Sequence, residues 1–374
     1  MTAPLRVGLL GCGRIARLAH LAVLRRLQGV HLVALAEADP HRRAEVRRSP
    51  AVTMVADYRE LLDMPDVEAV VVALPPSLHA DAAVAAFERG KHVYMEKPLA
   101  LTLAEAARML AAWRRSGLVG MMGFNYRFNR LYATARERIR AGLLGELVIA
   151  RSVFSTSTRP MPEWEQTRAR GGGALLSLGS HHIDLMRFLL DREIREVSAG
   201  WRTQRTEHDT AVIQMRLDGG LLVQSFFSFS AVEEDRVEIY GQEGKLTVDR
   251  SLSLNVEISP TTLRYARARQ LVRTLRAALG IPHAVDKILS PGREPSYRAA
   301  LAHFAAAVRF GRRASPDFCD GYRSVAVAEA AERCATTGSW VSLGHPMDAG
   351  LRMAATSGAA VHAASRRPGG VADV

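Results

Sequence analysis

Two residues of this chain have side chains that could together move a proton and stabilise the charge left behind, Lys97 and His181. Lys97 belongs to the tripeptide Glu96-Lys97-Pro98, which follows a short apolar run, and it is one of four lysines beside 46 arginines. A lysine ammonium is compact and its pKa shifts readily, so it could polarise a hydroxyl group and hold the alkoxide that forms. A surface ion pair between Lys97 and Glu96 is the structural alternative.

His181 lies in the segment 171–188, which opens with three glycines and continues with a helical pattern. Residues three and four apart are neighbours on a helix, so Ser177, His181 and Asp184 are expected on one face. A neutral imidazole could accept the hydroxyl proton, and Asp184 could orient the ring or cap the local structure. The alternative is that His181 only packs. His182 points to another part of the helix, and for it both a functional and a packing role stay open.

The segment Gly11-Cys12-Gly13-Arg14-Ile15-Ala16 follows an apolar run and leads into a helical pattern, which is typical of a dinucleotide-binding turn. Gly11 would let the chain turn sharply, and Gly13 would let backbone amides approach a pyrophosphate. Ala16 would let the helix pack closely on the strand, and the helix N-terminus adds partial positive charge. A strand, turn and helix without a ligand is the alternative interpretation.

The adenosine end of such a cofactor would meet the acid that ends the next apolar run, at 30–36. Glu37 is placed to accept hydrogen bonds from a ribose, and Asp39 is a second candidate. A carboxylate would repel a 2′-phosphate, which favours NAD. Arg42 and Arg43 could instead receive that phosphate, so NADP stays possible.

Apolar runs and helical patterns alternate from residue 5 to residue 123, which predicts a doubly wound parallel sheet, a Rossmann domain, over residues 1–123. Ligands gather beyond the carboxyl ends of parallel strands. The apolar runs 67–74 and 91–95 end at such a crevice. The residues expected there, beside the glycine turn, are Leu74, Pro75, Ser77, His79, Glu96 and Lys97.

Residues 124–345 are predicted to form an α+β domain with a large, open, mostly antiparallel sheet. The uncovered face of such a sheet could pair with another subunit. An arginine-rich amphipathic segment at 262–280 is typical of a solvated helix face, with contact to an anionic surface as the alternative. Residues 346–374 are predicted to be a frayed tail. The expected helices are 131–141, 295–310 and 320–336, and the expected strands are 147–154, 197–203, 210–217, 221–230, 236–240 and 245–248.

Composition limits the classes of protein that fit. The length of 374 residues, with 48% hydrophobic and 24% charged residues, favours two globular domains. No run approaches the ~18 apolar residues of a membrane span, and the N-terminus lacks a signal-peptide pattern, which together predict a cytoplasmic protein that binds no membrane. The three cysteines fit a reducing compartment and no metal-ligand spacing, and Cys12 is interpreted as a small filler residue. The net charge of +12 comes from dispersed arginines, which argues against nucleic-acid binding.

Taken together with Gly123-Phe124-Asn125-Tyr126-Arg127-Phe128, the motifs above resemble the Gfo/Idh/MocA oxidoreductase family over about residues 5–345. The resemblance implies an N-terminal Rossmann domain and a C-terminal α/β domain whose open sheet forms homodimers or homotetramers. It implies oxidation or reduction of sugar-like alcohols, with Lys97 and His181 at the nicotinamide end of the site.

One position departs from the family pattern. Many members have an aspartate four residues before the histidine, where this chain has Ser177. His181 then lacks that anionic partner unless Asp184 replaces it. Several arginines near the expected mouth of the site, among them Arg159, Arg168 and Arg170, could bind a carboxylate or a sugar-nucleotide phosphate, or be merely solvated.

We therefore expect an NAD(P)-dependent oxidoreductase acting on a secondary alcohol or ketone of a sugar, cyclitol or nucleotide-activated sugar. Two alternatives stay open: a dinucleotide-binding sensor that has lost catalysis, suggested by Ser177, and a redox-neutral enzyme with tightly bound NAD. The expected catalytic residues are Lys97, His181 and Asp184; the expected cofactor ligands are Gly11, Gly13, Arg14, Ile15, Ala16, Glu37, Leu74, Pro75, Ser77, His79, Glu96, Lys97 and Arg127; and the expected substrate ligands are Lys97, Arg127, Arg159, Trp164, Arg168, Ser177 and His181.

Overall fold

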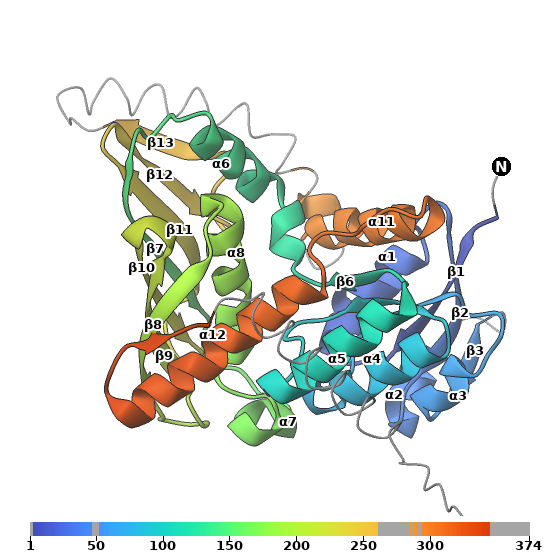
Figure 1. Ribbon diagram of the computed structural model, residues 1–374. Helices are drawn as coiled ribbons and strands as arrows, with labels where there is room; N and C mark the ends of the chain where they lie inside the picture. Colours follow the sequence, from blue (N-terminus) through green and yellow to red (C-terminus); the bar gives the residue numbers. More distant parts are fainter. Residues whose placement is uncertain (1–2, 47–51, 261–284, 286, 291–293, 345–374) are drawn as a thin grey trace, which may run out of the picture.

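The computed structural model describes residues 3–46, 52–260, 285, 287–290 and 294–344, and two β-sheets organise them (Figure 1). The first sheet has six strands in the order β3-β2-β1-β4-β5-β6, and every neighbouring pair is parallel. This is the doubly wound sheet that the sequence predicted. Its strands are β1 (Leu5–Leu10), β2 (Val30–Ala36), β3 (Thr53–Val55), β4 (Ala69–Val72), β5 (His92–Met95) and β6 (Gly120–Met122).

Both faces of the first sheet are buried, because successive residues of its central strand enter different apolar clusters. Val70 and Val72 of β4 pack in one cluster with residues of α4 and α5, whereas Ala69 and Val71 pack in another with residues of α1. This alternation follows from the two-residue period of a strand. The helical segments of this part are η1 (Ala16–His20), α1 (Leu21–Leu24), α2 (Pro40–Val46), α3 (Tyr58–Leu62), η2 (Pro76–Leu78), α4 (His79–Glu88) and α5 (Leu103–Ser116).

The second sheet has eight strands in the order β13-β12-β11-β7-β10-β9-β8-β14. Its neighbouring pairs are antiparallel except β7 and β10, which are parallel. The short edge strands β13 and β14 were not predicted, since too few residues alternate in them to give a periodic signal. The strands are β7 (Leu147–Ser155), β8 (Ile194–Arg202), β9 (Thr210–Leu217), β10 (Leu222–Ser228), β11 (Glu234–Gly241), β12 (Gly244–Asp249), β13 (Glu257–Pro260) and β14 (Val341–Ser342).

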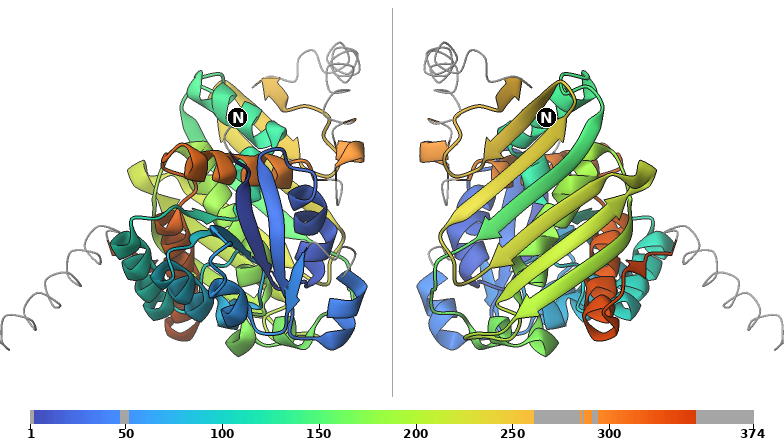
Figure 2. Two further views of the ribbon diagram at one scale, coloured as in Figure 1. Left: turned by 90° about the vertical axis from the view of Figure 1, so that its right-hand side faces the viewer. Right: turned by 90° about the vertical axis from the view of Figure 1, so that its left-hand side faces the viewer.

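Helices cover one face of the second sheet and leave the other face open (Figure 2, right). Burial alternates along β9, where Ala211, Ile213 and Met215 are buried and the residues between them are exposed. Helices α6 (Arg130–Arg140) and α8 (Ser180–Leu190) lie on the covered face. The short helical segments in the connections are η3 (Asn125–Phe128), α7 (Glu163–Gln166), η4 (Arg168–Arg170), η5 (Leu175–Gly179) and η6 (Asp218–Gly220).

The two last long helices of the described chain join the sheets. Helix α11 (Ser296–Arg309) returns to the first sheet, where Leu301 and Phe304 share a cluster with residues of β1 and α1. Helix α12 (Phe318–Thr337) contacts α5 on one side and β8 on the other, as Figure 1 shows. The predicted helices at 295–310 and 320–336 correspond to these two.

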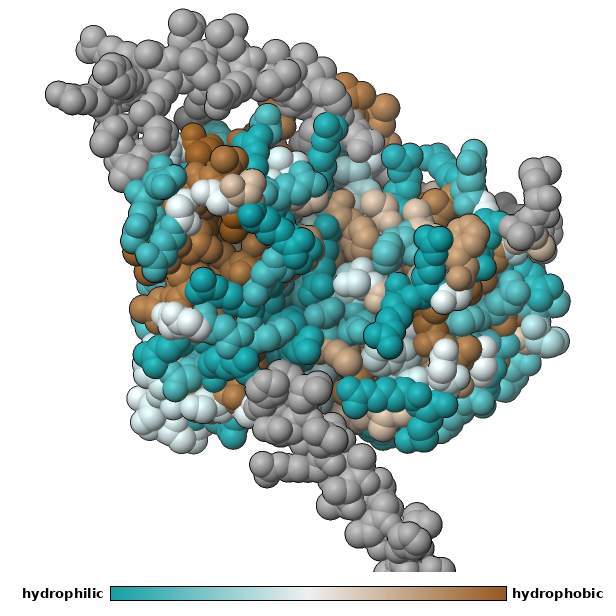
Figure 3. Space-filling view, turned by 45° about the horizontal axis from the view of Figure 1, so that its top comes forward, coloured by the Kyte–Doolittle hydropathy of each residue, from teal (hydrophilic) through white to brown (hydrophobic). Residues whose placement is uncertain are grey.

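Hydrophilic residues are spread over both halves of the face in Figure 3, with hydrophobic residues between them. Among the described helices, none is long and apolar enough to cross a membrane. The predicted strands of the second sheet all appear in the structure. The amphipathic segment 262–280 and the predicted tail 346–374 lie outside the described residues.

Candidate active site

The glycine turn after β1 is tight on one side and open on the other. Gly11 has φ +87°, and a Cβ atom there would lie 2.6 Å from the Ala73 carbonyl oxygen at the end of β4. A Cβ at Gly13 would meet no described atom within 4 Å. Ala16 is fully buried, Ile15 is half-buried and Arg14 is exposed. The turn therefore fits against the protein at Gly11 and leaves room at Gly13, as a cradle for phosphate groups requires.

Glu37 directly follows β2 and points back to the glycine turn. Its carboxylate accepts hydrogen bonds from the backbone N–H groups of Cys12 at 2.8 Å and Asp39 at 2.9 Å. Arg42 lies 3.3 Å from the same carboxylate, and Arg43 donates to backbone carbonyl oxygens. The two arginines that could have favoured a 2′-phosphate thus have partners in this chain, and the carboxylate of Glu37, the residue predicted to meet the ribose, is held in place.

The segment after β4 brings the predicted crevice residues to the glycine turn. Leu74 lies beside Gly11, whereas Pro75 is half-buried and Ser77 is exposed. His79 is buried, and its ring nitrogens meet the carbonyl oxygens of Pro98 at 2.7 Å and Leu74 at 3.0 Å. Burial lowers the pKa of His79, so the neutral ring has one N–H and donates to one of these two carbonyl oxygens. A contact between His79 and the cofactor stays a prediction.

Glu96 follows β5 and is held by a residue that the sequence did not single out. One carboxylate oxygen lies 2.8 Å from Nε2 of the fully buried His20, and the other accepts from the Lys97 N–H at 3.3 Å. The His20 ring packs edge-on against Tyr94 and Tyr297. The available signal was a histidine in η1, directly after the glycine turn. The hydrogen bond to His20 holds the Glu96 side chain in place at the end of β5.

Lys97 connects the first sheet to the helix of the second. Its Nζ donates a 2.7 Å hydrogen bond to the carbonyl oxygen of Ser177, in η5. Burial lowers the pKa of Lys97, while the carboxylates of Glu96 and Glu165 raise it and the charges of Arg159 and Arg14 lower it further. The lysine ends beside η5, directly before the helix that carries His181.

His181 lies on α8 with its ring stacked on Tyr126, at 4.4 Å between centroids and 11° between planes. Burial lowers the pKa of His181 well below its ordinary value, and the Lys97 charge adds to this effect. Among the described residues its buried Nδ1 has no hydrogen-bond partner. The imidazole is therefore neutral near pH 7, the form that can accept a proton.

A buried polar cluster behind His181 fixes the Tyr126 ring. The Tyr126 hydroxyl donates to Asp235 at 2.7 Å, and the Arg250 guanidinium lies 4.9 Å from the centre of the same ring. Asp235 also faces His182 at 3.1 Å and Arg250 at 2.6 Å. No pattern in the sequence pointed to Asp235, because it follows Tyr126 by more than a hundred residues. His182 thus faces the interior rather than the candidate site.

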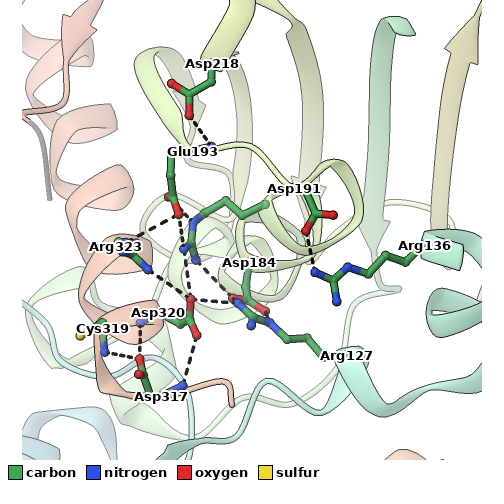
Figure 4. A network of polar contacts seen from close by, with 11 residues as sticks. Arg127, Arg136, Asp184, Asp191, Glu193, Asp218, Asp317, Cys319, Asp320 and Arg323 are labelled. Atoms are coloured by element: carbon green, nitrogen blue, oxygen red, sulfur yellow. Dashed lines mark hydrogen bonds and ion pairs between the residues drawn. The ribbon is translucent and has the colours of Figure 1, made fainter. Parts of the chain in front are cut away.

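Asp184 and Arg127 belong to a second buried network and not to His181 (Figure 4). Arg127 binds both oxygens of Asp184, at 2.8 and 2.5 Å, and reaches Asp320 of α12 at 3.1 Å. Arg187 contacts the same two aspartates and Glu193. The expectation that Asp184 orients His181 is wrong on this geometry, since guanidinium groups take both of its oxygens. Arg127, predicted at the cofactor, is likewise held by this network.

The side chain of Ser177 is hydrogen-bonded to Glu165, a carboxylate that was not predicted from the sequence. The Ser177 hydroxyl donates to Glu165 at 3.1 Å, and Arg159 donates to both oxygens of Glu165 at 2.9 and 3.0 Å. Glu165 is 5% exposed. A Cβ at Gly172 would lie 2.3 Å from the Glu165 carbonyl oxygen, so the glycine-rich loop is shaped to hold this residue. An acid among the arginines of 159–170 was the only signal in the sequence.

The other predicted substrate ligands lie in the same connection, between β7 and η5. Trp164 is half-buried on α7 beside Glu165. Arg168 contacts Glu332 of α12 and donates to the Leu101 carbonyl oxygen at 2.9 Å, and Arg170 contacts Glu163 at 2.5 Å. Arg168 and Arg170 are therefore bound within the chain.

Comparison with known proteins agrees with this architecture. The model of the oxidoreductase family with an NAD-binding Rossmann fold matches residues 5–124, and the model of the GFO/IDH/MocA C-terminal domain matches residues 132–247. A myo-inositol 2-dehydrogenase of Thermotoga maritima is 29% identical, over 66% of this chain and 75% of its own. A dTDP-3,4-didehydro-2,6-dideoxy-alpha-D-glucose 3-reductase of Saccharopolyspora spinosa is 27% identical, over 83% and 90%. The structure of a levoglucosan dehydrogenase with NADH and levoglucosan is 25% identical, covers 91% of this chain and 100% of its own, and has a TM-score of 0.77.

The two sheets, the glycine turn and the matches to both domain models define an oxidoreductase with an NAD-binding Rossmann fold. The chain belongs to the Gfo/Idh/MocA family. The family, the fold class and NAD as cofactor, all predicted from the sequence, are confirmed.

The two glycines of the turn should respond differently to alanine. Gly11→Ala meets both a positive φ and the Ala73 carbonyl, so its free energy of unfolding should fall by about 1–3 kcal/mol. Gly13→Ala meets no described atom, so its stability should stay within about 0.5 kcal/mol of wild type. Its affinity for NADH should fall instead, because the new methyl group occupies the space kept for phosphate. Urea denaturation and NADH fluorescence titration measure the two effects, and equal destabilisation by both substitutions would contradict this account.

The pKa of Lys97 should depend on Glu165. Because the Glu165 carboxylate raises that pKa, Glu165→Gln should lower it, while the effects of burial, Glu96, Arg159 and Arg14 on the Lys97 pKa stay in place. The chain has four lysines, so NMR of 13C-labelled lysine resolves few Cε signals, and Lys97→Arg identifies the relevant one. Glu163→Gln, on the exposed side of the same helix, is the control and should leave the titration unchanged. A Lys97 midpoint that does not move in Glu165→Gln contradicts the electrostatic contact.

Proposed function

We propose that the chain interconverts a secondary alcohol and a ketone of a sugar-like substrate, with Lys97 and His181 at the reacting carbon. The observation that carries this proposal is the hydrogen bond from Lys97 to the Ser177 carbonyl, which holds the ammonium beside the helix of His181. The charge of Lys97 also contributes to the lowered pKa of His181. Two groups with complementary roles are thus coupled in one site.

The residues around the glycine turn fit NAD. The open side of Gly13 would receive the pyrophosphate, and Glu37 would bind the adenosine ribose while opposing a 2′-phosphate. Leu74 and Pro75 border the turn on the β4 side. NAD, when bound, supplies the hydride acceptor, and the protein residues handle the proton and the oxygen.

The proton and the oxygen have separate partners in this proposal. His181 is neutral because it is buried, so it can take the hydroxyl proton in the oxidative direction. Lys97 in its ammonium form stabilises the oxygen as negative charge develops. Tyr126, stacked on His181 and tied to Asp235, fixes the ring and is a positioning residue. In the reductive direction the same groups return the proton.

The test is a pair of substitutions that leave the cofactor turn intact. Lys97→Met and His181→Asn should each lower kcat/KM at least ~100-fold, because each removes a group that acts on the reacting oxygen. NADH affinity should change only a few-fold. Lys245→Met, a lysine paired with Glu238 on the second sheet, is the matched control and should retain activity. Full activity of Lys97→Met would remove the lysine from the mechanism.

The same assays separate the alternatives. A sensor would bind NADH and show no turnover with any sugar or cyclitol. A redox-neutral enzyme would retain NAD through purification and convert its substrate without net change in NADH absorbance.

We also propose that the open face of the second sheet joins two or more copies of the chain. Ile149, Val212 and Leu222 are 39%, 40% and 41% exposed on it, and Leu222 pairs directly with Ile149 in the register of β10 and β7. An uncovered antiparallel sheet with apolar side chains is typical of a subunit interface.

An aspartate on this face should separate the copies. Val212→Asp and Leu222→Asp should shift the mass measured by light scattering to that of one chain, 40.9 kDa, because a charge would be buried at the interface. Val232→Asp, at an 85% exposed position outside the strands, is the control and should keep the wild-type mass. A single-chain mass for the wild type would overturn the proposal.

A cytoplasmic location is part of the same proposal. The three cysteines are unpaired, and burial raises the pKa of the Cys12 thiol to about 12. Unpaired, inert thiols fit a reducing compartment.

A further inference from the structure

Apart from Arg14, which is exposed in the glycine turn and expected at the cofactor, the arginines named near the candidate site are bound to carboxylates of the same chain. An arginine with a free guanidinium is the usual protein ligand of a substrate carboxylate or phosphate, because its paired donors match those oxygens. The arginines that the sequence suggested for this role are instead paired as Arg127 with Asp184 and Asp320, Arg159 with Glu165, Arg168 with Glu332, and Arg170 with Glu163.

Of these four pairs, that of Arg159 and Glu165 acts electrostatically on the Lys97 ammonium. Glu165 accepts from Arg159 through both oxygens and from the Ser177 hydroxyl through one, and the Ser177 carbonyl holds Lys97. The Arg159 side chain is 25% exposed, while that of Glu165 is 6% exposed. The guanidinium therefore faces a buried carboxylate that two neighbours keep in place.

A substrate anion would have to compete with Glu165 for Arg159. If it displaced Glu165, a buried carboxylate would be left without its counter-ion, which is strongly unfavourable. If it did not, the negative charge of Glu165 would repel it at short range. A hydroxyl group meets neither obstacle, since it can donate to a carboxylate and accept from a guanidinium.

We propose that the site takes an uncharged polyol, a sugar or a cyclitol, and that Glu165 is the residue that excludes substrates with a carboxylate or phosphate near the reacting carbon. This inference rests on the proposed function and names its substrate class. It also gives Ser177 a defined part, because the serine hydroxyl lets Glu165 approach where a carboxylate at residue 177 would repel it.

Matched substrate pairs test the proposal. Each neutral hexose is compared with the uronic acid that differs from it by one carboxylate, with NAD as cofactor and the wild-type protein. The neutral member should have a kcat/KM at least ~10-fold higher, since the charged one meets Glu165. A uronic acid or a nucleotide sugar preferred over every neutral sugar and cyclitol would overturn the proposal and leave the proposed oxidoreductase function intact.

Substitution of the acid assigns the selectivity to Glu165. In Glu165→Gln the Arg159 charge is no longer compensated, so the ratio of kcat/KM for the uronic acid to that for the hexose should rise ~10-fold or more. Adding Arg159→Gln should abolish this gain. Glu163→Gln removes an acid from the same helix α7 at an exposed ion pair and should leave the ratio unchanged. An unchanged ratio in a Glu165→Gln protein that keeps wild-type circular dichroism and NADH affinity would sink the assignment.

Binding distinguishes failure of this proposal from failure of the proposed function. If neither member of any pair is turned over with NAD or NADP, the oxidoreductase proposal fails, but calorimetry on the NADH-loaded protein still ranks the two members. Tighter binding of the neutral member supports the inference. Tighter binding of the uronic acid, or no binding by any neutral sugar or cyclitol, overturns it. The wild-type comparison also decides the question if Glu165→Gln does not fold.

Discussion

The hydrogen bond between the Lys97 ammonium and the Ser177 carbonyl oxygen is the contact on which the site depends. Lys97 follows strand β5 of the first sheet, and Ser177 precedes α8, which lies on the second sheet. The bond closes only if both sheets hold their places, because it spans residues 80 positions apart. The contacts of α12 with α5 and with β8 also hold the two sheets in place relative to each other. The chemistry proposed for His181 therefore depends on how the two sheets are joined.

Two groups of charged side chains surround this hydrogen bond, one close to Lys97 and one further away. Near Lys97, the carboxylates of Glu96 and Glu165 raise its pKa, whereas burial and the charges of Arg159 and Arg14 lower it. Further back, Asp235 fixes Tyr126, and Asp184 joins Arg127 to the helix that carries His181. A buried ion pair is costly to break even where it adds little net stability, so such pairs keep side chains in one arrangement. The arrangement leaves His181 neutral and Lys97 beside it.

The comparison of sequence and structure separates local from distant effects. The glycine turn, the acid after β2 and the lysine after β5 were predictable, since each is defined by its place at the end of a parallel strand. The ion pairs of Asp184 were not predictable, because helical spacing shows which residues share a face of a helix but not which residues of other elements contact that face. Here η5 has π-helical geometry before α8, and Arg127 reaches Asp184 from another element. Glu165 was missed because its partners lie 6 and 12 residues away in an irregular connection.

The sequence by itself determined the doubly wound sheet, the open second sheet, the dinucleotide turn and the two residues at the centre of the proposed chemistry, because periodicity and turn chemistry act over a few residues. Only the tertiary structure decided which carboxylate neutralises which arginine, how Tyr126 comes to support His181, and that Glu165 lies against Ser177. Ion pairs and ring contacts between distant residues depend on the final packing, and no local pattern in the chain specifies them.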